Sequence, residues 1–570
     1  MRNAHPTSHW TLPAHQALRR EAQSGSRVTQ CFASRPSGIA ALLHDAVRSH
    51  PQGEALVDGP RRWTWLELSQ TSTRIAESLA RLGVQRGDRV ALLMGNRAEF
   101  VVAFYAIALR GAVSVPLSTR DSAKGVAFIL AQCGARAVIV QADLTQLLPL
   151  QESADTVTLQ IICSDADGHE PPRTANATRW SDLLDPQAGP ALTQGLLQGG
   201  NAATVRADDG DDLAETDEAP ALILYTSGTT GQPKGAVITH RNVVHSALHY
   251  QICLGLQARE RAVLAVPCSH VTGLIAIVAA MGAVAGCVIV LREFKASRFL
   301  QLAAQERMSY TLMVPAMYAL CLRDPGITSC DLSAWRLGGF GGAPMPVSTI
   351  EQLATHCPAI RLFNAYGATE TTSPATLTPP GSQEIDAVGV ALPCASVIIM
   401  DEDGREMPPG ESGEVWIAGP MVVPGYWDNP QATAESFCGG YWKSGDIGTL
   451  DAAGFLRLHD RKKDMINRGG YKVFSVEVEN CLMGHPDVLE AAVVGVPCPV
   501  LGERVHAFVR TSSEADGQTG LAEAILALCR RDLSDYKVPE TLNLTLLPLP
   551  RNANGKLLKR ELRAQLAPPG

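Results

Sequence analysis

Short apolar runs alternate with helical segments through the first part of this 570-residue chain. The run at 89–94 (RVALLM) has the composition of a strand, and residues 97–111 then place apolar side chains at helical spacing. The same order returns with apolar runs at 112–117 and 136–140 and a helical segment at 125–134 between them. Because strands joined by helices form parallel sheets, this alternation predicts an α/β fold. Its large N-terminal domain would hold parallel or mixed sheets with flanking helices.

A change of composition near residue 460 divides the chain. Residues 454–472 (GFLRLHDRKKDMINRGGYK) are dense in charge and glycine, and a short pattern of strands and helices follows them. We therefore expect a large domain at 37–460 and a small, mobile α+β domain at 461–570, joined by a hinge. Residues 1–36 contain five arginines and one glutamate. They are expected to form a loose tail, with a targeting segment as the alternative.

Charge and cysteine content exclude several classes of protein. The 49 Lys and Arg against 57 Asp and Glu give a net charge of −8, so binding to nucleic acid is not expected. The 14 cysteines include no Cys-x-x-Cys pair, which argues against zinc ribbons and redox motifs and favours reduced thiols in a cytoplasmic protein. The uncharged run at 273–291 is interpreted as a buried helix, turn and strand, so no membrane span is expected.

Residues 221–240 (ALILYTSGTTGQPKGAVITH) carry the strongest chemical signal in the chain. An apolar strand leads into glycines, whose backbone N–H groups can approach an anion closely, and into hydroxyls and a lysine. This combination predicts a loop that binds polyphosphate. It is not the Walker pattern, because Gly235 follows the lysine instead of preceding it. The candidate phosphate-binding residues are Thr226, Ser227, Gly228, Thr229, Thr230, Gly231 and Lys234.

Four further motifs follow this loop in a fixed order. They are GGAP (341–344), NAYGATE (364–370), YWKSGD (441–446) with DRKKDMINRGGYKV (460–473), and PRNANGK (550–556). With the phosphate loop they span about residues 220–560, and their order resembles that of the adenylate-forming superfamily. This superfamily contains acyl-CoA synthetases, nonribosomal adenylation domains and firefly-type luciferases. The chain is most similar to the AMP-forming acyl-CoA ligases.

The resemblance implies a reaction in two steps. ATP converts a small carboxylic acid into acyl-AMP and pyrophosphate, and the acyl group then passes to CoA as a thioester. The implied cofactors are ATP and Mg²⁺, with CoA as a co-substrate, and the large domain would bind ATP and the acyl group. Transfer to a separate carrier protein is the main alternative. A luciferase-like oxygenase and a catalytically silent binding protein are two others.

The resemblance also assigns roles in the large domain. Glu370 is the implied Mg²⁺ carboxylate and a catalytic residue, since one hard oxygen ligand beside phosphates is typical of Mg²⁺ sites. Thr369 would bond the α-phosphate, and the ring of Tyr366 would stack on adenine. Thr226 is also an implied catalytic residue. So is His270, which resembles the family's histidine or aromatic residue that forms a gate between the acyl pocket and the thiol tunnel. The remaining nucleotide-binding candidates are Gly342, Ala343, Asn364 and Gly367.

Residues next to the expected hinge and in the small domain complete the implied site. Asp446 would accept hydrogen bonds from the ribose hydroxyls, and Arg461 would contact the ribose beside a hinge at Lys463, whereas Lys462 is expected to face solvent. The implied lining of the pantetheine tunnel is Gly469 and Gly470.

The acid is expected to be an uncharged monocarboxylic acid, aromatic or short-to-medium aliphatic. No acidic residue lies between Arg261 and Arg292, so the aspartate that amino-acid-activating relatives use is absent. Three residues depart from common family residues. Phe340 stands where a small residue is common and is expected to shorten or flatten the acid pocket, to which Met313 would also contribute. Ser475 replaces a frequent proline and Asn552 a frequent threonine, and both replacements are expected to be tolerated.

Lys556 is the implied catalytic lysine, because it resembles the family lysine that reaches both the acid oxygen and the α-phosphate. Lys556→Ala is expected to slow formation of acyl-AMP about 10²–10³-fold, the usual cost of one preorganised donor. ATP–pyrophosphate exchange measures this step. An unchanged exchange rate in the variant would contradict the assignment.

Overall fold

The structure is a computed structural model that describes residues 9–23, 27–149, 159–164, 169, 177–184, 217–226, 232–512, 518–551 and 557–566. The chain divides into two compact units. The first unit comprises Met1–Val397, Ile417–Lys443 and Ala453–Phe455. The second comprises Ile398–Trp416, Ser444–Ala452 and Leu456–Gly570. The observed α/β units match the predicted fold class.

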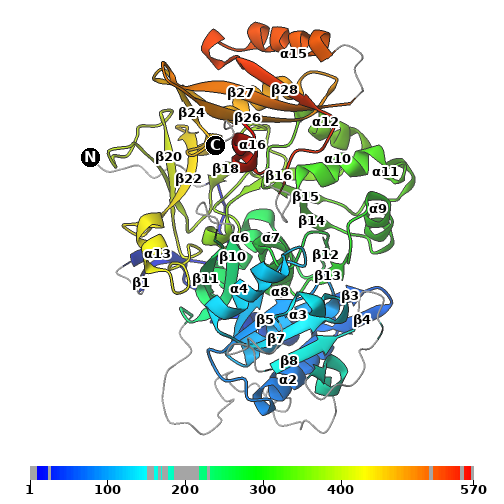
Figure 1. Cartoon of the computed structure of the whole chain (residues 1–570). Helices are drawn as coiled ribbons and strands as arrows, with labels where there is room; N and C mark the ends of the chain where they lie inside the picture. Colours follow the sequence, from blue (N-terminus) through cyan, green and yellow to red (C-terminus); the bar gives the residue numbers. More distant parts are fainter. Residues whose placement is uncertain are drawn as a thin grey trace. The chain divides into compact units, whose positions relative to one another are not determined.

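A seven-stranded sheet forms one layer of the first unit (Figure 1). The apolar run at 89–94 becomes its central strand, β5 (Arg89–Leu93). Val90 and Leu92 face one hydrophobic cluster while Ala91 and Leu93 face another, as expected for a strand buried on both faces. Every strand pair is parallel except β10–β11. The order is β11 (Lys234–Thr239), β10 (Pro220–Thr226), β6 (Val113–Pro116), β5, β7 (Ala135–Gln141), β8 (Leu159–Cys163) and β9 (Thr178–Arg179).

A second sheet forms another layer of the first unit, and its central strands are parallel. The order within this unit is β18 (Gly389–Ala391), β17 (Thr376–Leu377), β16 (Arg361–Tyr366), β15 (Leu337–Gly341), β14 (Tyr310–Met313), β12 (Arg261–Leu264), β13 (Cys287–Val290), β3 (Glu54–Asp58) and β4 (Arg61–Thr64).

Helices fill the space between these two sheets and cover their outer faces. The largest hydrophobic cluster joins both sheets through α1 (Ile39–Ser49), α2 (Trp65–Arg81), α3 (Ala98–Leu109) and α6 (His240–Leu254). Helix α4 (Ala123–Cys133) covers the other face of the first sheet. The second sheet is covered on its other face by α9 (Ala296–Gln305), α10 (Pro315–Arg323), α11 (Gly326–Ser329) and α12 (Val347–His356).

The apolar run at 273–291 lies in the core, as predicted. It folds as the end of α7 (Val271–Gly273), a π-helical segment η4 (Leu274–Ala279), α8 (Ala280–Val284) and β13, and nearly all of its residues are buried. Among the described residues, no helix combines the length and the apolar character needed to cross a membrane.

The second unit contains two groups of strands. Strands β19 (Ser396–Met400), β20 (Ser412–Ala418), β22 (Tyr441–Leu450) and β23 (Phe455–Arg461) form the first group and have most of their residues in this unit. The second is a five-stranded sheet of β25 (Tyr471–Val473), β24 (Ile466–Arg468), β27 (Gly502–Thr511), β26 (Val488–Cys498) and β28 (Thr541–Thr545). Helices α14 (Ser475–Met483), α15 (Gln518–Asp532) and α16 (Lys559–Ala564) accompany that sheet.

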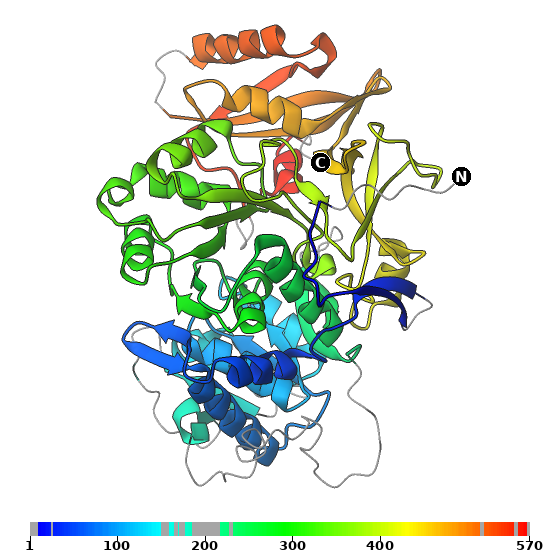
Figure 2. The ribbon, with the colours of Figure 1, turned by 180° about the vertical axis from the view of Figure 1, so that it is seen from behind.

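The N-terminal segment differs from the loose tail that its composition suggested. Within the described residues of 1–36, β1 (Leu18–Gln23) and β2 (Arg27–Phe32) pair as an antiparallel hairpin, and Phe32 is fully buried. The dark-blue hairpin lies beside the yellow α13 (Pro430–Ser436) and β21 (Phe437–Cys438) in both ribbon views (Figures 1 and 2). The arginines that suggested a targeting segment include Arg27 and Arg35, which bind partners in the first unit.

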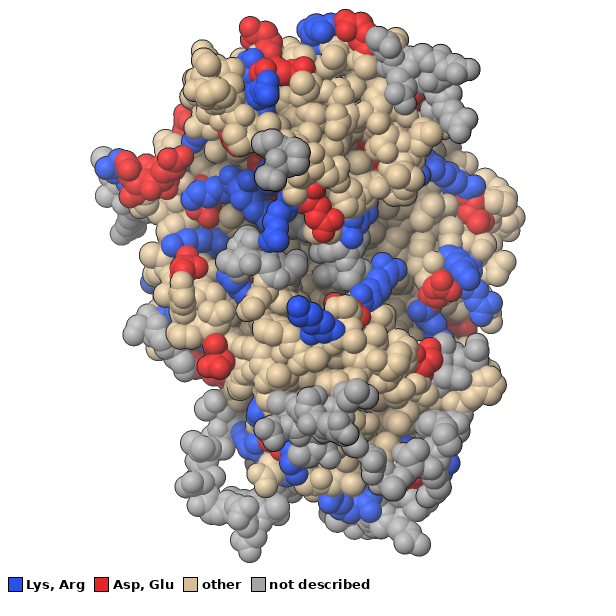
Figure 3. Space-filling view, viewed as in Figure 1, with Lys and Arg blue, Asp and Glu red and all other residues tan. Residues whose placement is uncertain are grey.

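Charged side chains of both signs are interspersed among broad uncharged areas on the face drawn in Figure 3. Much of the charge in the first unit is paired. For example, Arg62 and Arg261 both bind the buried carboxylate of Glu306. Asp217 and Glu218 are the last of seven acidic residues between positions 208 and 218, and both bind arginine.

Candidate functional site

The predicted phosphate loop begins and ends on two paired strands of the first unit. Strand β10 ends at Thr226 and β11 begins at Lys234, and the antiparallel register places these two residues opposite each other. The pairing therefore closes the base of the loop with a hydroxyl on one side and an ammonium group on the other. The loop residues Ser227, Gly228, Thr229, Thr230 and Gly231 lie outside the described part of the chain.

Two predicted motifs meet at the carboxyl ends of neighbouring parallel strands. Gly341, the first residue of GGAP, ends β15, and the residues Asn364, Ala365 and Tyr366 of NAYG end β16, with Gly341 paired to Ala365. A side chain on Gly341 would come within 2.4 Å of the Ala365 carbonyl oxygen, so this position requires glycine. Crevices at the carboxyl ends of parallel strands are where open α/β sheets bind ligands.

The nucleotide candidates on these two strands are held firmly. Asn364 is buried, its backbone N–H donates to the Thr378 hydroxyl at 2.7 Å, and its side-chain amide donates to the Ala387 carbonyl at 3.4 Å. Tyr366 ends β16 and is half-buried. Gly342 has a φ of 77° in the turn after β15, and Ala343 follows it at the surface.

A tight turn follows NAYG and presents the end of the motif. A side chain on Gly367 would overlap the Ser373 carbonyl oxygen, 1.6 Å away. Thr369 begins the short helix η5 (Thr369–Thr371), and Thr372 and Ser373 then take φ values of 52° and 97°, in the left-handed region. Such backbone strain in residues other than glycine is concentrated at functional sites.

Glu370 is the central acidic residue of the site. Only 8% of its surface is exposed, and its Oε1 accepts a hydrogen bond from the Tyr426 phenol at 2.8 Å. Burial, followed by the charge of Glu370, raises the pKa of Tyr426, so the phenol stays protonated and remains a donor. The Lys234 ammonium lies 5.4 Å from the centre of the same Tyr426 ring. Tyr426 thus links the predicted phosphate loop to the predicted Mg²⁺ ligand.

This donor set fits Mg²⁺ held together with a polyphosphate. Mg²⁺ is usually bound by one or two carboxylates plus substrate phosphates and water, instead of by a cage of protein ligands. Glu370 would supply the carboxylate, and Lys234 and Thr226 are among the residues predicted to bind the phosphate. Among the described residues, no group of three or more His, Cys, Asp and Glu is arranged to hold a metal by itself.

His270 precedes α7, near the carboxyl end of β12. Its backbone N–H donates to Pro267 at 3.2 Å, and its side chain is half-buried. Phe340 and Met313 belong to the hydrophobic cluster under α9, α10 and α12, with at most 5% of their surface exposed. Their predicted effect on the acid pocket stays a prediction, as does the gating role of His270.

The second unit carries its own predicted residues. Asp446 and Arg461 are paired across β22 and β23, with Arg461 Nε 3.2 Å from Asp446 Oδ1. Asp446 is 7% exposed. Lys462, predicted to face solvent, is half-exposed and binds Glu414 at 3.0 Å. The turn between β24 and β25 consists of Gly469 and Gly470, both with positive φ.

Buried polar groups surround the residue that precedes Arg461. Asp460 accepts hydrogen bonds from the backbone N–H and, at 3.0 Å, from the hydroxyl of Ser475. Lys559 donates to that hydroxyl at 2.6 Å and binds Glu479 at 2.7 Å. Burial raises the pKa of both Asp460 and Glu479, although the positive charge of Lys559 acts to lower it. Lys556 itself lies outside the described residues, as does Asn552.

The sequence reasoning missed Tyr426. The residue lies in a Pro-Gly-Tyr-Trp turn, 56 positions after Glu370. The only local signal was an aromatic residue next to Pro-Gly. Local spacing does not indicate that this residue bonds Glu370.

Comparisons with known proteins extend over nearly the whole chain. The family described as AMP-binding enzyme matches residues 43–427, and the AMP-binding enzyme C-terminal domain matches residues 477–556. A feruloyl-CoA synthase of Amycolatopsis sp is 33% identical over 534 residues, which cover 93% of this chain and 99% of that protein. A fatty acid–[acyl-carrier-protein] ligase of Streptomyces coeruleorubidus is 31% identical over 525 residues, 90% of this chain and 93% of that protein.

A solved structure resembles the chain over the same extent. The O-succinylbenzoate coenzyme A synthetase of Bacillus subtilis, in complex with ATP and magnesium ion, aligns with a TM-score of 0.75 at 27% sequence identity. The alignment covers 92% of this chain and 99% of that one.

The bond between Tyr426 and Glu370 generates a prediction. Tyr426→Phe keeps the ring under Lys234 and removes the phenol, so Glu370 loses a partner that fixes its orientation. Loss of a residue that orients a metal ligand typically costs about 10–100-fold in metal affinity or activity. We expect the Mg²⁺ concentration that half-saturates ATP–pyrophosphate exchange to rise by about that factor.

The matched control is Tyr441→Phe, which removes a phenol bonded to Ser396 and leaves Glu370 untouched. Equal Mg²⁺ dependence in the two variants would show that the Tyr426 phenol does not orient Glu370.

Proposed function

Because the chain belongs to the AMP-binding enzyme family, the adenylate-forming superfamily, we propose that it is an AMP-forming acyl-CoA ligase. The relatives reported above are named as CoA synthases or ligases, and one of them is solved with ATP and magnesium ion. The specific proposal is that this chain joins an uncharged monocarboxylic acid to CoA, with Mg²⁺ as the metal.

The observation that best supports the proposal is that Tyr426 contacts both Glu370 and Lys234. The phenol of Tyr426 bonds a buried carboxylate, and an ammonium group lies 5.4 Å from the centre of the same ring. A carboxylate suits a divalent cation and an ammonium group suits phosphate. The pair is therefore suited to a nucleoside triphosphate bound with its metal.

The proposed first step activates the acid. A carboxylate oxygen attacks the α-phosphorus of ATP, an acyl-AMP forms, and pyrophosphate leaves with the electrons of the broken P–O bond. The enzyme must hold two anions together, so its residues act mainly by positioning and by neutralising charge. In this account Thr226, Lys234 and the residues at 227–231 hold the phosphates, and Glu370 holds the Mg²⁺, which neutralises phosphate charge.

The remaining nucleotide contacts are proposed residue by residue. Thr369 bonds the α-phosphate. The adenine base lies against Tyr366, with Asn364 and the Gly342–Ala343 turn at its border and Gly367 permitting the tight turn. Asp446 accepts hydrogen bonds from the ribose hydroxyls, and Arg461 contacts the ribose. Lys556 contacts the acid oxygen and the α-phosphate.

The proposed second step transfers the acyl group. The CoA sulfur attacks the carbonyl carbon, the bond from that carbon to the AMP oxygen breaks, and AMP leaves as the thioester forms. Gly469 and Gly470 take positive φ values with no side chains, which suits close passage of a thin pantetheine arm. His270 is proposed to stand where the acyl pocket meets this arm.

The class of acid is proposed from residues Arg261–Arg292, the segment that begins with β12. Residues Arg261–Arg292 contain no Asp or Glu, so this segment provides no counter-ion for an amino group. The feruloyl-CoA synthase relative is named for an aromatic acid and the carrier-protein ligase relative for a fatty acid. An uncharged aromatic or aliphatic acid is consistent with both.

Transfer to a carrier protein is the second candidate, and the 31% identical fatty acid–[acyl-carrier-protein] ligase supports it. The two candidates share the first step and differ in the thiol that attacks acyl-AMP. They are separated only by the acceptor.

A panel of acids tests the proposal in two stages. ATP–pyrophosphate exchange is measured with aromatic, short and medium aliphatic monocarboxylic acids, and with amino acids and dicarboxylic acids as controls. We expect exchange with an uncharged monocarboxylic acid, because no acidic side chain is available in that segment to bind an ammonium group. Preference for an amino acid or a dicarboxylic acid would contradict the proposed acid class.

The best acid is then offered with CoA or with an acyl-carrier protein that bears its phosphopantetheine arm. AMP release and thioester formation are measured by mass spectrometry. Product with CoA is expected, whereas product with the carrier protein alone would establish the second candidate.

A further inference from the structure

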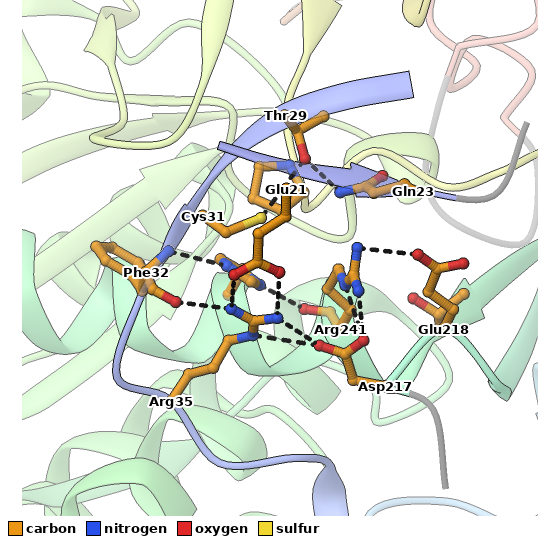
Figure 4. A network of polar contacts seen from close by, with 12 residues as sticks. Glu21, Gln23, Thr29, Cys31, Phe32, Arg35, Asp217, Glu218 and Arg241 are labelled. Atoms are coloured by element: carbon orange, nitrogen blue, oxygen red, sulfur yellow. Dashed lines mark hydrogen bonds and ion pairs between the residues drawn. The ribbon is translucent and has the colours of Figure 1, made fainter. Parts of the chain in front are cut away.

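The N-terminal hairpin is fixed to the first unit by a network of ion pairs (Figure 4). Arg35 donates two hydrogen bonds to Glu21, at 2.8 and 2.7 Å, and also bonds Asp217 at 2.8 Å. Arg241, on α6, binds Asp217 at 2.6 Å and Glu218 at 3.0 Å. Both arginine side chains are only 10% exposed. The hydrogen bond from Arg35 lowers the pKa of Glu21 to about 2, so this carboxylate stays charged.

The network connects the hairpin to the segment that leads into the predicted phosphate loop. Asp217 and Glu218 immediately precede β10, whose last residue is Thr226. Removing one partner of a buried, hydrogen-bonded ion pair strongly destabilises a fold, because the remaining charge is left without its partner. The hairpin is therefore an integral part of the first unit.

Arg27 extends from the start of β2 to a second segment. Its guanidinium donates to the Val423 carbonyl at 3.0 Å and to the Pro424 carbonyl at 3.1 Å. It also lies 5.5 Å from the centre of the Phe437 ring. Burial lowers the pKa of Arg27 from its usual value, in keeping with its largely enclosed position. A single planar group thus fixes two successive carbonyls from outside the segment.

The segment held by Arg27 reaches the nucleotide site within three residues. The Val423 N–H donates to the Glu370 backbone carbonyl at 2.9 Å. The Gly425 carbonyl accepts from Val237, and the Trp427 N–H donates to Gly235 at 2.7 Å, next to Lys234. Between these anchors stands Tyr426, whose phenol bonds the Glu370 carboxylate.

We propose that Arg27 is a positioning residue for the Mg²⁺–ATP site. By holding the carbonyls of Val423 and Pro424, it fixes the Tyr426 phenol against Glu370, and the ion pairs of Arg35 hold Arg27 in place. The N-terminal hairpin, remote in sequence from every predicted motif, is thereby required for the first half-reaction. The inference rests on the proposed function, because it concerns the same metal and nucleotide.

The test compares Arg27→Gln with Arg20→Gln in the full chain. Arg20 lies on the partner strand of the hairpin and is exposed, so its replacement changes the charge equally without touching residues 423–427. In ATP–pyrophosphate exchange with the best acid, Arg27→Gln should raise the half-saturating Mg²⁺ concentration about 10–100-fold, the usual effect of losing an outer-shell partner. Excess Mg²⁺ should restore much of the exchange rate of Arg27→Gln. The half-saturating Mg²⁺ concentration of Arg27→Lys should lie between those of wild type and Arg27→Gln.

Amide hydrogen exchange gives a readout that needs no ligand. In Arg27→Gln the peptides covering residues 420–429 and 365–372 should exchange faster than in wild type, whereas peptides covering β5 and α3 should be unchanged and so show that the variant is folded. Unchanged exchange at 420–429 would overturn the inference. Faster exchange there with an unchanged Mg²⁺ dependence would overturn it as well, because Arg27 would then hold the segment without acting on Glu370.

A different measurement would contradict the proposed function. If that function is wrong, the wild-type chain shows no ATP–pyrophosphate exchange with any of the acids. Failure of the present inference appears only in the comparison of Arg27→Gln with wild type and with Arg20→Gln.

Discussion

A single carboxylate held in the interior of the first unit is the constraint on which the rest of the site depends. Glu370 is almost fully buried, and a buried carboxylate is unfavourable unless hydrogen bonds or a cation compensate its charge. The Tyr426 phenol gives one hydrogen bond and fixes the direction of one oxygen. The negative charge then favours a cation beside it, close to where Lys234 and Thr226 would receive phosphate. In the proposed function, the Tyr426 ring therefore lies beside both the residue that would hold the metal and a residue that would bind phosphate.

The fold explains why distant motifs meet. GGAP and NAYG span the carboxyl ends of two adjacent parallel strands, which end at Gly341 and Tyr366, so both motifs lie at one edge of the sheet. Thr226 and Lys234 are brought together differently, by an antiparallel pair that closes the loop between them. Strand–helix alternation was sufficient to predict the α/β fold, and the composition of residues 221–240 was sufficient to predict a strand that leads into a phosphate-binding loop. The strand order and the antiparallel pairing of β10 with β11 were not predicted, because they depend on contacts between separate segments.

Other parts of the site could not be predicted, because their contacts join residues far apart in sequence. Tyr426 contacts a residue 56 positions away, and Arg27 contacts one 396 positions away. The composition of residues 1–36 predicted a loose tail, with a targeting segment as the alternative, because it does not reveal the partners of Arg27 and Arg35. Ser475 was treated as a tolerable replacement for proline. Its N–H and hydroxyl both bind Asp460, and proline has neither group.

The most direct test of the central claim follows the oxygen atoms of the acid. The best acid, labelled with ¹⁸O in its carboxylate, is incubated with ATP, Mg²⁺, CoA and the enzyme, and AMP is analysed by mass spectrometry. If the carboxylate attacks the α-phosphorus, one labelled oxygen becomes the bridge of acyl-AMP and stays with AMP when sulfur takes the acyl group. The account predicts one ¹⁸O in each AMP and the other in the thioester carbonyl. AMP that carries no label would contradict it.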